Sequence, residues 1–213
     1  PRGHFCPPAT SIAKQFPCPN GTFNNKTMLV DVSQCQICLS GMYCDRPGLE
    51  VPRGFCEAGY YCGGGSTTAT PDRNQPYQGE TCVDQTNATG NGVCPPGHFC
   101  PEGSSSPSLC EPGTYTPKGF DGTGLQNSSQ CRTCKAGYYC PTYATIEIIP
   151  CTEGFYCPMG TVTPSLLCAS GHYCEEGSID QISCDPGTFQ KASGQADCDQ
   201  CPAGFWCSMG NFS

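Results

Sequence analysis

A seven-residue motif recurs seven times along this chain: cysteine, two residues, glycine, one residue, an aromatic residue and cysteine. The copies are Cys38–Cys44, Cys56–Cys62, Cys94–Cys100, Cys134–Cys140, Cys151–Cys157, Cys168–Cys174 and Cys201–Cys207. An eighth copy, at residues 1–6, lacks only its first cysteine, which the register places before Pro1. A motif repeated at near-constant spacing is typical of a repeat array and argues against one globular core around a single active site.

Composition indicates how such an array can be held together. Leu, Ile, Val and Phe make up 30 of the 213 residues, too few for the aliphatic core that a domain of this length normally buries. The 22 cysteines offer another route to order. A disulfide that closes a loop of about 15 residues removes roughly 3 kcal/mol of unfolded-chain entropy. We therefore expect crosslinks in place of a core.

A second motif, C-x2-G-T-aromatic, punctuates the first. It begins at Cys18, Cys110 and Cys184, and after a variable loop each copy is followed by a C-x2-C pair: Cys35/Cys38, Cys131/Cys134 and Cys198/Cys201. The second cysteine of each pair opens a copy of the seven-residue motif. This spacing predicts four parts: 1–17 is the end of a preceding repeat, 18–109 one super-repeat with an insertion at 63–93, 110–183 a second, and 184–213 the start of a third.

The predicted fold class is a tandem of small disulfide-rich modules, mostly loop with short β-strands and almost no helix, forming an elongated rod-like array. Gly and Pro total 48 residues, and neither propagates a helix. We expect a short strand at each G-x-aromatic-Cys and another at Thr145–Ile149. The motif glycine is predicted to adopt a positive φ in a tight turn, and the aromatic residue before the second cysteine to pack against the nearby disulfide.

The number of cysteines implies an oxidising, extracellular or cell-surface location. Five Asn-x-Ser/Thr sequons are candidate N-glycosylation sites: Asn20, Asn25, Asn87, Asn127 and Asn211. The Ser/Thr/Pro stretches 66–71 and 104–108 are either O-glycan acceptors or bare solvated loops. Covalent glycans are thus expected, but no cofactor. A net charge of −8 argues against nucleic acid and anionic membranes as partners.

Disulfide connectivity cannot be read from cysteine positions alone. The six-cysteine run C-x2-G-T…C-x2-C-x5-C-x(10–11)-C-x5-C resembles the cysteine-rich modules of the tumour necrosis factor receptor family, and still more the ephrin-receptor-like repeats. The receptor-like pairing implies the bonds Cys18–Cys35, Cys38–Cys56, Cys44–Cys62, Cys110–Cys131, Cys134–Cys151, Cys140–Cys157 and Cys184–Cys198.

Some cysteines depart from that family pattern. Cys168 and Cys174 have no obvious partners except each other, and Cys82, Cys94 and Cys100 form an odd set. A rival scheme joins the last cysteine of each unit to the first of the next, for example Cys157–Cys168 and Cys174–Cys184. Cys6 has no assigned partner.

The sequence shows little sign of catalytic or metal chemistry. The three histidines, His4, His98 and His172, all occupy one slot of the motif, which Tyr, Phe or Met fills in other copies. The C-x2-C pairs lie too far apart for a four-cysteine zinc site and lack a thioredoxin-like setting. No EF-hand, G-x-S-x-G or H-E-x-x-H pattern is present. We expect neither an enzyme nor a metal site.

These features predict a non-enzymatic structural role outside the cell: a glycosylated segment of a surface coat, fibre or flagellar-appendage filament. Its expected partners are proteins, namely copies of itself or neighbouring repeats joined head to tail, with no membrane insertion by this segment. The alternative is the ligand-binding ectodomain of a receptor or adhesion protein, for which the insertion at 63–93 is the best contact candidate. We also expect flanking sequence, with a cysteine before Pro1 and another soon after Ser213.

Overall fold

The computed structural model describes residues 1–72, 90–116, 124–208 and the backbone of 211–212. The chain divides into two compact units. Unit 1 comprises Pro1–Leu109 and Gly119–Gln130, and unit 2 comprises Cys110–Lys118 and Cys131–Ser213. The four predicted parts, from the preceding repeat to the third super-repeat, remain predictions.

Both units consist of two-stranded antiparallel hairpins, each built from strands close in sequence. In unit 1 the pairs are β1 (His4–Phe5) with β2 (Phe16–Pro17), β3 (Thr22–Phe23) with β4 (Gln36–Ile37), β5 (Met42–Tyr43) with β6 (Gly54–Phe55), β7 (Tyr60–Cys62) with β8 (Asn91–Val93), and β9 (His98–Phe99) with β10 (Ser108–Leu109). In unit 2 they are β11 (Thr114–Tyr115) with β12 (Arg132–Thr133), β13 (Tyr138–Tyr139) with β14 (Ile149–Pro150), β15 (Phe155–Tyr156) with β16 (Leu166–Leu167), β17 (His172–Tyr173) with β18 (Ile182–Ser183), β19 (Thr188–Phe189) with β20 (Asp199–Gln200), and β21 (Cys207–Ser208) with β22 (Asn211–Phe212).

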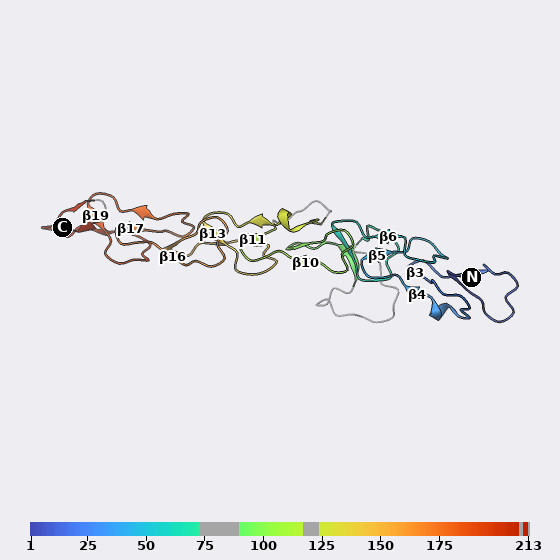
Figure 1. Cartoon of the computed structure of the whole chain (residues 1–213). Helices are drawn as coiled ribbons and strands as arrows, with labels where there is room; N and C mark the ends of the chain where they lie inside the picture. Colours follow the sequence, from blue (N-terminus) through green and yellow to red (C-terminus); the bar gives the residue numbers. More distant parts are fainter. Residues whose placement is uncertain (73–89, 117–123, 209–210, 213) are drawn as a thin grey trace. The chain divides into compact units, whose positions relative to one another are not determined.

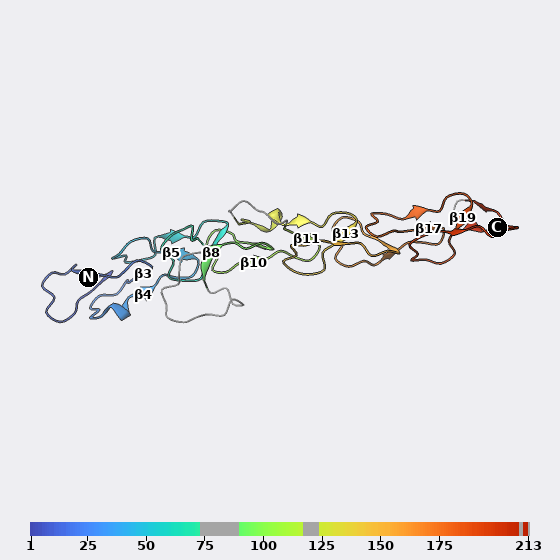
Figure 2. The same ribbon diagram turned by 180° about the vertical axis from the view of Figure 1, so that it is seen from behind.

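The hairpins share one plan. In all pairs but β21–β22, the first strand directly follows a motif glycine, and the second strand ends one residue before the cysteine that opens the next motif. One module therefore runs from one opening cysteine to the next. Within unit 2, the modules that contain β11, β13, β17 and β19 succeed one another in chain order (Figure 1). The view from behind shows the same for β3, β5 and β10 in unit 1 (Figure 2).

The predicted fold class is confirmed for its local structure: short strands, mostly loop, and disulfides throughout. The only helices among the described residues are two three-residue 3-10 turns, η1 (Val32–Gln34) and η2 (Ser128–Gln130). The strand predicted at Thr145–Ile149 is wrong, because only Ile149 lies in a strand, β14. Its neighbours instead form the loop in which Thr145 is buried and hydrogen-bonded to the carbonyl oxygen of Thr142, at 2.6 Å.

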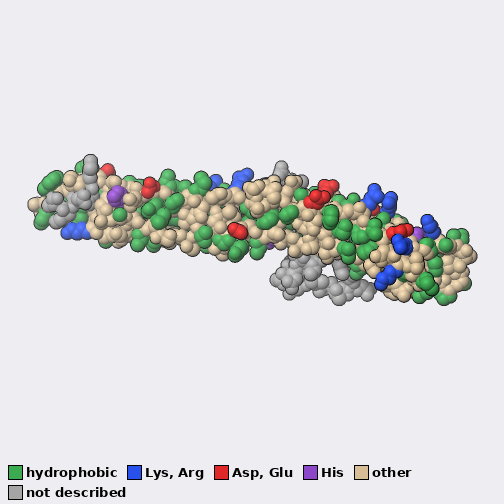
Figure 3. Space-filling view, in the orientation of Figure 1, with side chains coloured by type: hydrophobic (Ala, Val, Ile, Leu, Met, Phe, Trp, Pro, Cys, Tyr) green, Lys and Arg blue, Asp and Glu red, His purple; other side chains and the backbone are tan. Residues whose placement is uncertain are grey.

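Cysteines take the place of an aliphatic core. Ten disulfides occur among the described residues, and most of their sulfur-bearing side chains are fully buried. Large aliphatic side chains, by contrast, are often exposed; Met28, Val51 and Ile179 are examples. On the face shown in Figure 3, hydrophobic side chains are scattered over each unit among polar atoms. The units thus cohere through crosslinks and backbone hydrogen bonds.

Candidate functional site: the repeated joint between modules

Seven of the ten disulfides close a single copy of the seven-residue motif. They are Cys38–Cys44, Cys56–Cys62, Cys94–Cys100, Cys134–Cys140, Cys151–Cys157, Cys168–Cys174 and Cys201–Cys207. The tight turn at the motif glycine reverses the chain within the motif. In the copy that begins at Cys38, the turn brings the two Cα atoms to 5.9 Å, within the usual range for a disulfide.

These local bonds correct four pairs that the receptor resemblance implied: Cys38–Cys56, Cys44–Cys62, Cys134–Cys151 and Cys140–Cys157. They also correct the rival pairs Cys157–Cys168 and Cys174–Cys184, because each of these cysteines is bonded within its own motif or module. The physical reason is distance, because the turn at the motif glycine already brings the cysteine six residues away within bonding range.

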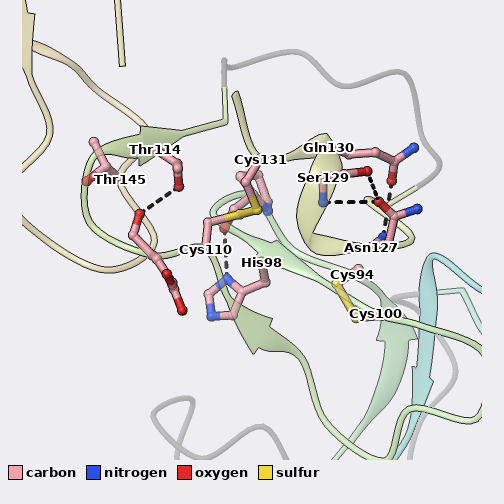
Figure 4. The surroundings of a disulfide bond; sticks show 12 residues. Cys94, His98, Cys100, Cys110, Thr114, Asn127, Ser129, Gln130, Cys131 and Thr145 are labelled. Carbon is pink, nitrogen blue, oxygen red and sulfur yellow. Dashed lines mark hydrogen bonds between the residues drawn. A yellow bond between two sulfur atoms is a disulfide. The ribbon is translucent and has the colours of Figure 1, made fainter. Parts of the chain in front are cut away.

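The other three disulfides are those the resemblance implied for the G-T motif: Cys18–Cys35, Cys110–Cys131 and Cys184–Cys198. Each joins the opening cysteine of a module to the first cysteine of the following C-x2-C pair. Figure 4 shows one bond of each kind, Cys94–Cys100 and Cys110–Cys131. Cys6 is a free, partly exposed thiol, and Cys82 lies outside the described residues.

The G-T modules differ at the sixth residue after the opening cysteine. Where the seven-residue motif has its second cysteine, these modules have Asn24, Thr116 and Gln190, and all three are buried polar residues. The side-chain amide of Asn24 donates a 2.7 Å hydrogen bond to the carbonyl oxygen of Gln34, and that of Gln190 donates to Asp197 at 3.0 Å. In the modules that open at Cys18 and Cys184, a side-chain hydrogen bond thus occupies the place of the local disulfide.

Consecutive modules are joined by four backbone hydrogen bonds that recur at equivalent positions. At the joint between the modules opening at Cys134 and Cys151, they run from Gly137 N–H to Cys157 O (2.8 Å), Cys151 N–H to Gly137 O (2.8 Å), Gly160 N–H to Cys134 O (2.8 Å) and Cys140 N–H to Thr161 O (3.0 Å). In unit 1, the corresponding bonds run from Gly41 to Cys62, Cys56 to Gly41, Gly65 to Cys38 and Cys44 to Ser66. We call this set the joint.

The joint depends on two glycine positions. The motif glycine has the predicted positive φ, for example +81° at Gly137, and this prediction is confirmed in every motif copy. A Cβ atom added to Gly137 would lie 2.5 Å from the carbonyl oxygen of Gly177. Gly177 occupies the second glycine position, in the C-x2-G-S/T turn that follows a second cysteine, two modules after Gly137; Gly160 occupies it in the joint described above. The motif glycine is therefore needed both for its backbone conformation and for close approach.

The second glycine position is where non-glycine residues adopt a strained conformation. Among the described residues, Ala9, Met28 and Ala144 are the only non-glycine residues with positive φ, and Met28 and Ala144 each lie ten residues after the opening cysteine of their module. The Ala144 N–H donates to the carbonyl oxygen of Cys110 at 2.9 Å, as Gly160 does to Cys134. The backbone geometry of the joint thus persists even where the side chain disfavours it.

Aromatic residues pack differently from the prediction. Phe23 and Tyr115, from two G-T modules, are buried against the disulfide of the following module; Phe23, for instance, lies against Cys38 and Cys44. Most aromatic residues before a second cysteine, such as Tyr43, are half-buried instead, and the Tyr43 ring lies over Gly54 on the paired strand. The apolar cover of a disulfide is therefore shared between neighbouring modules.

The histidines have the same local contact in each case. Nδ1 of His4, His98 and His172 lies 2.9, 3.0 and 3.2 Å from the carbonyl oxygen two residues earlier. Each C-x2-C pair is divided between two disulfides, as for Cys35 and Cys38. Among the residues that the structure describes, no group of three or more His, Cys, Asp or Glu side chains is placed to hold a metal ion.

Three of the five sequons have described side chains. Asn20, Asn25 and Asn127 are exposed. Asn87 lies outside the described residues, and of Asn211 only the backbone, in β22, is described. In the first candidate O-glycan stretch, Ser66 is buried, and its hydroxyl donates to the carbonyl oxygen of Thr68 at 2.8 Å.

Sequence reasoning missed the sixth-position residues and the second glycine turn. Both had a signal. When the two motifs are aligned on their glycine, Asn24, Thr116 and Gln190 fall on the second cysteine. The turn is visible as Gly-Ser or Gly-Thr shortly after many second cysteines, as at Gly103 and Gly160.

No protein-family model matches the chain, and no curated protein matches it significantly. In the described part of the chain, no helix has the length and apolar character needed to cross a bilayer. The disulfide content fits an extracellular cysteine-rich protein.

Proposed function

We propose that this chain is a non-enzymatic structural segment of an extracellular glycoprotein, part of a surface coat, fibre or appendage filament. The observation that supports this most strongly is the joint. The same four backbone hydrogen bonds recur from module to module, for example at Gly41 and at Gly137, so one unit of construction is used again and again. Repetition of a joint suits a load-bearing or space-filling array, where each module contacts mainly its neighbours.

The mechanical logic follows from the bonds themselves. Each disulfide closes a loop inside one module, while only backbone hydrogen bonds and packing join a module to the next. A pulling force along such an array would break the hydrogen bonds of the joints before it unfolded the modules. The joints could then re-form, because no covalent bond had broken. Copies of the chain, or neighbouring repeats, would meet head to tail by a heterologous contact. The array is proposed to be elongated.

The alternative is a ligand-binding ectodomain, and one feature favours it. In sequence, the segment between β7 and β8 is the longest that joins two paired strands, and the described residues on either side of it are paired at Cys62 and Asn91. Binding of a protein ligand would then concentrate in the module that opens at Cys56.

Negative-stain imaging of native material would separate these proposals. Long regular fibres support the structural role, whereas short isolated rods that bind a soluble protein support the receptor role. Small-angle scattering from the purified chain tests elongation independently: a radius of gyration near the compact-domain value of about 17 Å for 213 residues would contradict an extended array. Deletion of residues 73–89 should leave fibre formation unchanged in the first case and abolish ligand binding in the second.

A further inference from the structure

The two 3-10 turns of unit 1 are capped by the same arrangement of side chains. In η1, Oδ1 of Asp31 accepts from the Ser33 N–H at 2.8 Å, and Oε1 of Gln34 accepts from the Asp31 N–H at 3.2 Å. In η2, Oδ1 of Asn127 accepts from the Ser129 N–H at 3.1 Å, and Oε1 of Gln130 accepts from the Asn127 N–H at 3.3 Å (Figure 4). The turns differ in one respect, because the cap of η2 is also the asparagine of a sequon.

The side chain of Asn127 is held by two hydrogen bonds, both to its oxygen. Besides the Ser129 N–H, the Ser129 hydroxyl donates to Oδ1 at 2.6 Å. Nδ2 makes no hydrogen bond to another described residue, and Asn127 is exposed. All the groups involved belong to residues 126–130, so the arrangement requires no distant part of the chain.

The other two described sequons lack this arrangement. The side chains of Asn20 and Asn25 are exposed and make no hydrogen bond to another described residue. Thr22, the hydroxyl residue of the first sequon, donates to the carbonyl oxygen of Pro19 at 2.6 Å rather than to Asn20. A glycan on Asn20 or Asn25 would therefore be attached to a freely rotating amide.

We propose that Asn127 is an N-glycosylation site whose amide caps η2 through Oδ1 and carries an oriented glycan on Nδ2. The inference rests on the proposed extracellular function, which places the chain in the secretory route. In the transfer, Nδ2 forms a bond to the anomeric carbon of an oligosaccharide donated by a lipid pyrophosphate. The bond from that carbon to the pyrophosphate oxygen breaks, and Nδ2 loses one proton. The carbonyl oxygen is untouched, so the cap survives the modification.

Fixing Oδ1 also fixes the plane of the amide, and with it the direction of the bond to the first sugar. The glycan is then a rigid feature of the surface beside η2. In a repeat array, a glycan with a fixed orientation would shield one side of its module. A freely rotating glycan would not shield any one side.

The experiment uses the whole chain, secreted from a eukaryotic host and labelled with 15N. Glycopeptide mass spectrometry after amidase release in 18O-water reports occupancy, and relaxation of the single N–H on glycosylated Nδ2 reports its order parameter. At Asn127 we expect occupancy and an order parameter of about 0.8, as in rigid backbone, against below about 0.6 at Asn20 or Asn25 where those are occupied. An unmodified Asn127, or an order parameter below about 0.6 there, would overturn the proposal.

The chain provides two matched variants. Asn127→Asp keeps the acceptor oxygen, as Asp31 shows at the equivalent position, but removes the sequon. Its unfolding equilibrium should match that of the wild-type chain produced without N-glycosylation within twofold, while Asn127→Ala should shift it about fivefold toward the unfolded state. Equal effects of Asp and Ala would contradict the cap.

The second variant creates a site. Asp31→Asn completes the sequon Asn-Val-Ser on η1, and we expect a new glycan there with the same high order parameter. A glycan with a low order parameter at residue 31 would contradict the geometric argument. Two results distinguish this inference from the proposed function. Free thiols in the native compartment would contradict the proposed extracellular function. A chain that forms fibres but carries no glycan on Asn127 would contradict only the present inference.

Discussion

The side-chain amide of Asn24 donates a 2.7 Å hydrogen bond to the carbonyl oxygen of Gln34, the residue before disulfide-bonded Cys35. Asn24 Oδ1 also accepts from the Lys26 N–H at 2.7 Å. With 1% of its surface exposed, Asn24 is among the most buried polar residues in the structure. It therefore ties the middle of the loop that the Cys18–Cys35 disulfide closes to the end of that loop beside Cys35.

Removing this side chain should be costly. In Asn24→Ala, the Gln34 carbonyl and the Lys26 N–H lose their partner inside the module, and we expect a loss of about 2 kcal/mol in the free energy of unfolding. Denaturant unfolding of the intact, oxidised chain measures it. The matched control is Asn25→Ala, next in sequence but exposed, which should change stability by less than about 0.5 kcal/mol. Equal losses in the two variants would show that the amide bridge does not hold the loop.

The two glycine positions should differ in their tolerance of a methyl group. Gly137 and Gly177 have nearly the same φ, +81° and +80°. A Cβ on Gly137 would meet the Gly177 carbonyl oxygen at 2.5 Å, but a Cβ on Gly177 meets nothing closer than the Gly137 oxygen at 3.9 Å. Backbone strain is thus common to both variants, and the clash is confined to Gly137→Ala.

We expect Gly177→Ala to cost about 1 kcal/mol for the left-handed conformation alone. Gly137→Ala should cost a further 1–3 kcal/mol or so, since the modules must move apart. Thermal unfolding of the two variants under oxidising conditions provides the comparison. Matching losses would show that φ, and not close approach, makes the motif glycine necessary.

Much of this architecture could be predicted from the sequence. The parts that could not be predicted were missed for physical reasons. The positive φ of the motif glycine was predictable, because a tight turn between two cysteines leaves few alternatives. The second strands were not, since segments such as Ser108–Leu109 and Asp199–Gln200 share no side-chain pattern; both are exposed and are specified by backbone pairing. The pairing of Cys38 was mistaken because regular spacing places a partner at six residues and another at eighteen, and only the turn distinguishes them.

The Asp31 carboxylate should make stability depend on pH. The Ser33 backbone N–H, and after it the Ser33 side chain, hold the pKa of Asp31 below its ordinary value by hydrogen bonding to the charged form. A carboxylate whose pKa is lower in the folded state stabilises the fold above its unfolded pKa of about 3.9, and this stabilisation is lost as the pH falls through the folded value. Protonation would weaken the cap of η1.

The comparison variant is Asp31→Asn, produced without N-glycosylation, in which an amide oxygen accepts from the same N–H, as Asn127 does in η2. We expect the wild-type chain to lose its advantage over Asp31→Asn as the pH falls from 7 to below about 4. Chemical unfolding across that range measures the difference. A constant difference between the two chains would contradict a role for the Asp31 charge.

The local disulfides can be tested without mutation, because the modules opening at Cys134 and Cys151 contain suitable cleavage sites. Trypsin cuts after Arg132 and Lys135, and a glutamate-specific protease cuts after Glu147 and Glu153. The four cysteines of interest then lie on four separate peptides, at 133–135, 136–147, 148–153 and 154–175. Non-reducing mass spectrometry identifies which are linked.

With the bonds Cys134–Cys140 and Cys151–Cys157, peptide 133–135 is linked to 136–147, and 148–153 to 154–175. With the receptor-like bonds, 133–135 would be linked to 148–153 instead, and 136–147 to 154–175. The two outcomes differ in mass, so a single digest decides between them. Local disulfides place no covalent crosslink across the joint, so we expect the joint to open first under force. Peptide masses that match the receptor-like bonds would contradict this expectation.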